Sequence, residues 1–152
     1  MQSEVLKYAH EGFQSAVERF SKDMAALTHE DLDRKWGDSS RRAYDVVYEL
    51  GVLNQRAVKV LNEEDPGPLP WKFGEEWLQA PDELRSMEEA TLFFDESARN
   101  LLATAVSKAE SADEEATFKI FKTLNFAASH TGYHDAQLNF IQALKGDHAL
   151  HW

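Results

Sequence analysis

Two histidines four positions apart, His130 and His134, are the side chains of this chain best placed to do chemistry. On a helix, with about 100° between successive residues, the two imidazoles lie one turn apart and can share a single metal ion. Apolar residues at helical spacing direct the pair toward the interior of the fold: Ile120, Leu124, Ala127, Leu138 and Ile141. The alternative is that each imidazole only makes a hydrogen bond inside the core.

Glu49 is the candidate for the third ligand, which a metal site needs from another helix. Measured from Val46, its direction lies about 60° to one side of the apolar stripe, so its carboxylate is expected at the core boundary. A carboxylate there needs a cation, either a metal or an arginine, and Arg42 and Arg56 lie on the same flank. The residues leave ligation and ion pairing open. Two imidazoles and one carboxylate would suit Zn²⁺, Ni²⁺, Fe²⁺ or Mn²⁺.

The other four histidines have no comparable spacing. We predict that His10 and His29 are solvated. His148 and His151 flank the C-terminal tail and are expected to be inert, and the alternative is that they reach the mouth of the bundle. The chain also has no Gly-rich phosphate loop, nucleophile elbow or HExxH motif. These enzyme classes are therefore excluded, and the sequence assigns no catalytic residue.

Charge and composition limit the partners. The 27 acidic and 16 basic residues give a formal net charge of −11, so phosphate backbones and anionic lipid surfaces would be repelled. We expect neither a nucleic acid nor a membrane as partner. The absence of cysteine excludes disulfides and thiolate ligands and favours a reducing compartment. An acidic, amphipathic N-terminus and the lack of a membrane-length apolar run complete the prediction of a cytoplasmic protein.

Four long helices must position these residues, because apolar side chains recur at three-and-four spacing in four segments. The predicted helices run from Ser3 to Leu27, from Ser39 or Ser40 to Leu61, from Asp82 or Ser86 to Ala109, and from the segment 111–115 to Lys145, with Gly146 as the stop. A short turn capped by Thr28 follows the first helix. With 152 residues, 43% of them apolar, the chain is predicted to form one domain over residues 1–152. The predicted fold class is all-α, a four-helix bundle.

A long loop is predicted between the second and third helices. Residues 65–81 hold all four prolines, two glycines and two tryptophans, which a regular helix cannot accommodate. Trp71, Phe73 and Trp77 would anchor the loop as a strap across the bundle, and the alternative is a lid over a substrate.

A second apolar row on the last helix lies roughly 100° from the histidines and consists of Phe126, Tyr133, Phe140 and Leu144. We expect this row to pack on a neighbouring helix of the same bundle. The alternative is a two-fold homodimer interface.

The segment His130-Thr-Gly-Tyr-His134-Asp-Ala-Gln137, followed by an apolar run and Gly146, resembles the last helix of the DinB/YfiT-like family, which has a His-x3-His-x2-Gln pattern. The stretch from Ser40 to Glu49 is similar to the start of that family's second helix. The resemblance implies a four-helix bundle, often dimeric, that binds a divalent metal between helices two and four. His130 and His134 match two of the family's ligands, and Glu49 stands nearest to the position where the family has a third histidine.

The same resemblance implies a metal-dependent enzyme, either a hydrolase or a thiol transferase, that acts on a small-molecule substrate. The metal would lower the pKa of a bound water or a substrate thiol and so generate a nucleophile at neutral pH. Glu49 would serve as ligand or as general base. Because Glu49 replaces a histidine, the second hypothesis is a non-catalytic bundle with a degenerate metal site, acting as a small-ligand-binding or interaction protein.

Overall fold

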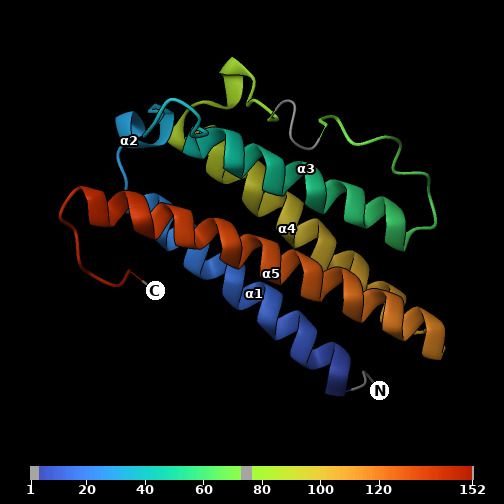
Figure 1. Cartoon of the computed structure of the whole chain (residues 1–152). Helices are drawn as coiled ribbons and strands as arrows, with labels where there is room; N and C mark the ends of the chain where they lie inside the picture. Colours follow the sequence, from blue (N-terminus) through green and yellow to red (C-terminus); the bar gives the residue numbers. More distant parts are fainter. Residues whose placement is uncertain (1–3, 73–76, 152) are drawn as a thin grey trace.

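The computed structural model describes residues 4–72 and 77–151, and within them the chain is helical and contains no strand. Its elements are α1 (Glu4–Ala25), α2 (His29–Asp33), α3 (Ala43–Leu61), the 3-10 turn η1 (Asp82–Leu84), α4 (Met87–Ala109) and α5 (Glu114–Leu144). The four long helices pack side by side as a bundle (Figure 1). The predicted all-α class is confirmed. No helix among the described residues is long and apolar enough to cross a membrane.

The four long helices run in two directions. As Figure 1 shows, α1 and α5 run one way and α3 and α4 run the other way. Because α3 and α4 are parallel, the chain between them must return along the whole of α3, about 28 Å. Residues 62–72 and 77–81 belong to this return and contain no helix or strand. The antiparallel arrangement of α3 and α5 sets the first turns of α3 against the second half of α5.

The ends of α2 and α5 follow their sequence signals. The Thr28 side chain accepts a hydrogen bond from the Asp31 N–H, and the Asp31 carboxylate accepts one from the Thr28 N–H, at 2.9 Å, so the predicted cap is present. Gly146 has a φ of 81° and ends α5 in the left-handed conformation that favours glycine. Its N–H donates to the carbonyl of Ala143, and the next N–H donates to that of Gln142, both at 3.0 Å. This is a Schellman motif.

The second long helix begins later than predicted, at Ala43 instead of Ser39 or Ser40. Ser40 is used in a tight turn, in which its Oγ accepts a hydrogen bond from the Gly37 N–H at 2.9 Å and its own N–H donates to the Gly37 carbonyl at 3.0 Å. Side-chain bonding of serine to nearby backbone competes with helix initiation. Arg41 therefore precedes the helix, and its side chain lies along the first turns of α3.

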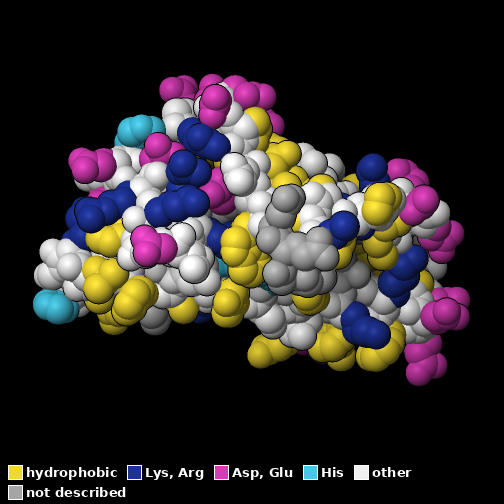
Figure 2. All heavy atoms as spheres, turned by 45° about the horizontal axis from the view of Figure 1, so that its top comes forward, with side chains coloured by type: hydrophobic (Ala, Val, Ile, Leu, Met, Phe, Trp, Pro, Cys, Tyr) yellow, Lys and Arg dark blue, Asp and Glu magenta, His cyan; other side chains and the backbone are white. Residues whose placement is uncertain are grey.

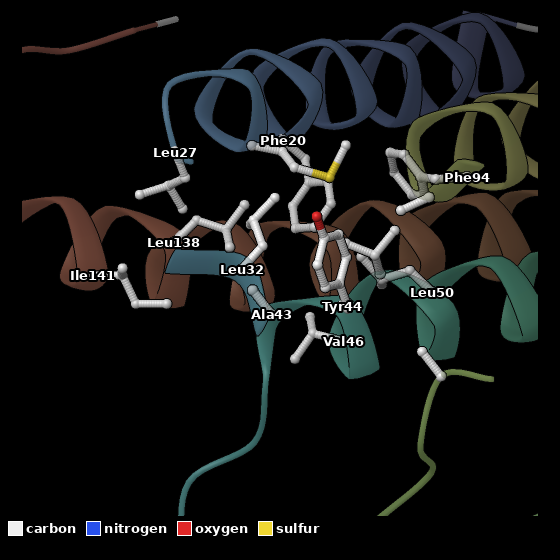
Figure 3. Packing of buried hydrophobic residues seen from close by; sticks show 14 residues of the cluster. Phe20, Leu27, Leu32, Ala43, Tyr44, Val46, Leu50, Phe94, Leu138 and Ile141 are labelled. Atoms are coloured by element: carbon white, nitrogen blue, oxygen red, sulfur yellow. The ribbon is translucent and has the colours of Figure 1, made fainter. Parts of the chain in front are cut away.

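The core consists of two hydrophobic clusters separated by polar side chains. The first cluster includes Tyr44, Leu32 and Leu138, which point into one space between α1, α3 and α5 (Figure 3). The second cluster includes Phe13 and Leu101. Between the clusters lies a set of buried polar side chains, here called the polar layer: Glu49, Asn54, Ser97, Thr131 and His134. Buried polar groups need internal partners, and the candidate site lies in this layer.

The second apolar row of α5 is exposed, so the prediction that it packs inside the bundle is wrong. Phe126 is 59% exposed, Tyr133 and Phe140 are 64% exposed, and Leu144 is 53% exposed. The neighbouring helices instead cover the face of α5 that carries buried Leu124 and Leu138. The periodicity identified both apolar faces but did not distinguish which one the bundle covers.

Gly51 allows α3 to approach α4 closely. A Cβ atom at Gly51 would lie 2.2 Å from Cε1 of Phe93, whereas a Cβ atom at Gly132 on α5 would meet nothing within 4 Å. We expect Gly51→Ala to lower the free energy of unfolding by about 1–3 kcal/mol, and Gly132→Ala to raise it by about 0.5–1 kcal/mol. Urea denaturation measures both. An equal loss from Gly51→Ala in wild-type and Phe93→Leu backgrounds would contradict the steric explanation.

Candidate metal centre

The three predicted site residues come together between two helices. Glu49 on α3 and His130 and His134 on α5 each offer one ligand atom, and these atoms lie within 4.8 Å of one another. Glu49 Oε1 is 3.2 Å from His130 Nε2 and 3.5 Å from His134 Nε2. The two Nε2 atoms are 2.8 Å apart. The three atoms therefore form a compact triangle at the edge of the polar layer, with His130 on its outer side.

The size of this triangle fits a single divalent metal ion. Ligands about 2.0–2.1 Å from Zn²⁺ in a tetrahedral site are about 3.3 Å from one another. The observed separations, 2.8, 3.2 and 3.5 Å, lie around this value. Two imidazoles and one carboxylate also leave an open position for water or substrate, and they suit Zn²⁺, Ni²⁺, Fe²⁺ and Mn²⁺ alike. The donor set fits a divalent metal without selecting which one.

Gln137 determines which nitrogen of His134 faces the triangle. Its Oε1 lies 2.8 Å from His134 Nδ1. Because an amide oxygen can only accept, Nδ1 carries the ring proton and Nε2 presents a lone pair toward Glu49. Metal-binding histidines usually have such an outer partner. Without a metal, two acceptors face each other, and only a proton from His130 can lie between them. The arrangement favours a cation at the centre.

Glu49 is buried and charged. Burial raises the pKa of its carboxyl, but the neighbouring imidazoles of His130 and His134 and the positive charge of Arg41 outweigh this effect and hold the pKa well below its usual range. The carboxylate is therefore ionised at neutral pH. Arg41 pairs with Oε2 of Glu49, which leaves Oε1 to face the two imidazoles.

The partner of Glu49 differs from the two arginines that the sequence suggested. Arg42 pairs with other carboxylates, and Arg56 donates to the backbone carbonyls of residues 66–68 at 2.7–2.8 Å. Arg41 takes this role, eight positions before Glu49. On an uninterrupted helix the Arg41 side chain would point away from Glu49. The helical pattern of the sequence therefore did not indicate this ion pair. The late start of α3 explains the difference.

His130 forms the accessible side of the site. Its side chain is 22% exposed, whereas that of His134 is 2% exposed. The rings of Phe126 and Tyr133 lie against it, with centroid distances of 5.5 and 6.4 Å. A shallow hollow between α3 and α5 reaches His130 and is otherwise lined mainly by Leu50, Leu53, Ala57, Phe126 and Ala127. The three candidate ligands are therefore reached from the surface at His130.

The remaining aromatic and histidine predictions have mixed outcomes. Trp71 is buried, and Trp77 lies over the guanidinium of Arg41, 4.8 Å from its ring centroid, while Phe73 lies outside the described residues. His29, predicted to be solvated, is exposed, but its Nδ1 lies 2.9 Å from the Tyr44 hydroxyl. Trp77 is thus connected to the site through Arg41, a link that the sequence did not indicate.

Comparison of the chain with models of protein families, with curated proteins and with solved structures finds no match. What the site does is therefore inferred from its donor atoms, its charges and its surroundings.

Proposed function

We propose that the chain is a metal-dependent enzyme of the DinB/YfiT-like type, a hydrolase or thiol transferase whose divalent metal is held by Glu49, His130 and His134. The observation that carries this proposal is the triangle of three donors, with Nδ1 of His134 held outward by Gln137. The resemblance of the histidine segment to that family's last helix supports it. Four long helices packed side by side are compatible with the family's four-helix bundle.

A divalent metal here would supply a Lewis acid that generates a nucleophile from water or a thiol at neutral pH. The chain's own residues hold and shield the centre. Arg41 holds Glu49 Oε2, and Gln137 holds the His134 ring. The lowered pKa of Glu49 makes it a weak general base, so we assign it the role of ligand. The rings of Phe126 and Tyr133 line the accessible side at His130.

The second candidate is a non-catalytic bundle that binds a small ligand or an interaction partner. The ion pair between Arg41 and Glu49 favours this candidate, because it already balances the buried carboxylate. The 2.8 Å contact between His130 and His134 is also short enough for a hydrogen bond. In this case the three residues form a hydrogen-bonded cluster in the polar layer.

Elemental analysis distinguishes the two candidates. The chain is purified without an affinity tag, exposed to Zn²⁺, Ni²⁺, Fe²⁺ or Mn²⁺, and desalted beside a His130→Ala/His134→Ala variant. The enzyme proposal expects a stoichiometric divalent metal in the wild type and none in the variant. Equal, negligible metal in both proteins would favour the non-catalytic bundle.

We also propose that the exposed aromatic row of α5 joins two copies of the chain. Its side chains follow one line along the helix, and an isologous contact around a two-fold axis would cover both copies of the row. Phe140→Asp is expected to convert a dimer into a folded monomer, because it places a charge in that contact. Light scattering measures the mass, and circular dichroism confirms the fold.

Val5→Asp is the matched control, because Val5 is 52% exposed on α1, outside the row. This variant should stay dimeric. A wild-type chain that is monomeric at high concentration, or a dimer that survives both Phe140→Asp and Tyr133→Asp, would show that the row does not join two copies.

A further inference from the structure

A second hollow, of about 330 Å³, lies beside the metal centre where the chain enters α3. Its lining includes Lys35, Ser40, Arg41, Arg42, Asp45 and Trp77. Three of the chain's 16 cationic side chains thus line one hollow in a molecule whose net charge is −11. Figure 2 shows Lys and Arg side chains gathered on the face that carries the start of α3. The volume is in the range of small-ligand pockets, and the charge selects for an anion.

The positive charge of Lys35 and Arg41 is only partly neutralised. No carboxylate of the described residues lies within ion-pair distance of the exposed Lys35. Arg41 pairs with Glu49 through Nη2, but its buried Nε has no hydrogen-bond acceptor among the described residues. A buried donor without an acceptor is costly, so Arg41 is a lining side chain of the hollow whose hydrogen bonding is incomplete.

Asp45 is the one carboxylate among the described residues that line the hollow, and its oxygens already have partners. Asp45 is 3% exposed, and its Oδ1 accepts a hydrogen bond from the Ala80 N–H at 2.9 Å. Its Oδ2 accepts one from the Arg42 N–H at 3.3 Å. Because both oxygens are used by the backbone, Asp45 competes weakly for the guanidinium of Arg41. The hollow therefore keeps a net positive character.

Trp77 holds the guanidinium of Arg41 in place. Its ring centroid lies 4.8 Å from Arg41 Cζ, close enough for a cation–π interaction. A stacked guanidinium keeps its N–H donors free at its edge, and these donors match the oxygen spacing of phosphate and carboxylate groups. Arg41 is thus preorganised to bind an anion on one side while it contacts Glu49 on the other.

We infer that this hollow binds the phosphate or carboxylate group of a small ligand, and that the anion competes with Glu49 for Arg41. Neutralising Glu49 would release Arg41 and strengthen anion binding. A metal bound at Glu49 would act in the same direction, and the coupling would be reciprocal. The coupling to a bound metal rests on the proposed function, whereas the anion site itself does not.

The test is a titration of the metal-free, full-length protein followed by nuclear magnetic resonance. Sodium sulfate stands for a phosphate group and sodium succinate for carboxylates, with ionic strength held constant by sodium chloride. Binding in the hollow should shift the indole N–H of Trp77 and the Nε–H of Arg41 in a saturable manner. The anion with the lower Kd identifies the class of group that the hollow prefers.

Four variants locate the binding. Arg41→Gln should raise the Kd about tenfold, because it removes a charge-assisted hydrogen bond, and Lys35→Glu should raise it by a similar factor. Arg99→Gln, an exposed arginine on α4 away from the hollow, should leave the Kd unchanged. Glu49→Gln should lower the Kd severalfold without any metal, because Arg41 loses its competing carboxylate. Lys35 is exposed, so its variant remains informative if Arg41→Gln does not fold.

Each outcome decides one part of the inference. No saturable shift at Trp77 with either anion, or equal Kd values for wild type, Lys35→Glu and Arg99→Gln, would overturn the anion site. An unchanged Kd in folded Glu49→Gln would overturn the competition for Arg41. Metal content is measured separately, so either failure leaves the proposed metal centre standing, and loss of the metal centre leaves the titration interpretable.

Discussion

Replacing His134 with alanine should reduce the affinity for Zn²⁺ by more than about 100-fold. Loss of an outer partner alone typically costs about 10–100-fold, and His134 supplies one of only three donors. Its side chain is 2% exposed, so the substitution also leaves a cavity, and we expect an additional loss of about 1–3 kcal/mol in stability without metal. His130→Ala also removes a ligand, but at a more exposed position, where less packing is lost. Comparing the two variants therefore separates loss of a ligand from loss of packing.

The Glu49→His substitution tests whether position 49 on α3 faces the two histidines. It would create a three-histidine site like that of the resembled family and should raise the affinity for Zn²⁺ or Ni²⁺. The structure adds a condition, because the Arg41 side chain is 11% exposed and would lose its carboxylate partner. The double variant Arg41→Gln/Glu49→His removes this unpaired charge and is the cleaner comparison.

Calorimetric Zn²⁺ titrations in one buffer compare these proteins directly. The series contains wild type, His130→Ala, His134→Ala and Arg41→Gln/Glu49→His, with His10→Ala as a control away from the site. Metal binding should also weaken as the pH falls, because only a neutral imidazole binds a metal. If the folded histidine variants bind Zn²⁺ as well as wild type does, and the double variant binds no better, the three residues do not share a metal.

A second large effect, on the dependence of stability on pH, is expected at Asp135, which lies on α5 and is 7% exposed. Burial raises the pKa of its carboxyl, and a hydrogen bond with Asp23 of α1 and the negative charge of Asp23 raise it further, to about 7, while Arg19 acts in the opposite direction. Asp23 is fully buried and accepts hydrogen bonds from Asn139, at 2.8 Å, and Gln142, at 3.3 Å. The contact between the two helices therefore favours the protonated form of Asp135.

This raised pKa predicts how stability depends on pH. An unfolded aspartate loses its proton near the ordinary aspartate pKa of 3.8, whereas the raised pKa of folded Asp135 keeps it protonated until about pH 7. The free energy of unfolding contributed by this group is thus fully present below the unfolded pKa and falls as the pH rises through that window. Asp135→Asn retains the shape and a donor toward Asp23 at every pH. We expect it to remove the slope and to raise stability at about pH 8 by about 1–3 kcal/mol.

Urea denaturation at about pH 5 and about pH 8 measures this effect. Asp38→Asn is a matched control on the surface, since Asp38 is exposed and lies outside the long helices, and it should leave the slope unchanged. An Asp135→Asn protein that loses as much stability between the two pH values as wild type does would show that the buried carboxyl pair does not set the slope.

Local patterns predicted most of what positions the candidate site. The apolar seam of the last helix placed His130 and His134 toward the interior, and Thr28 and Gly146 identified helix ends where the structure has them. These features depend on residues within a few turns of one another, which periodicity and capping rules describe well. Glu49 was found in the same way, from its angle to the apolar face of its own helix.

Features that depend on which elements become neighbours were not predictable. The pairing of Arg41 with Glu49 requires the chain to break before α3, and the turn at Ser40 that causes this break reads equally well as a helix cap. The pairing of Asp23 with Asp135 requires α1 and α5 to run in the same direction. Neither relation leaves a periodic signal in the sequence, because each joins residues on separate elements.

The polar layer also bears on the cooperativity of the molecule. It lies between the cluster around Tyr44 and the cluster around Phe13, which are two packing units joined by polar side chains and by Val17, which packs against both. Units joined in this way open locally with separate free energies. A cation that links α3 to α5 within the layer would hold the two units together, so that the bundle would unfold as one unit.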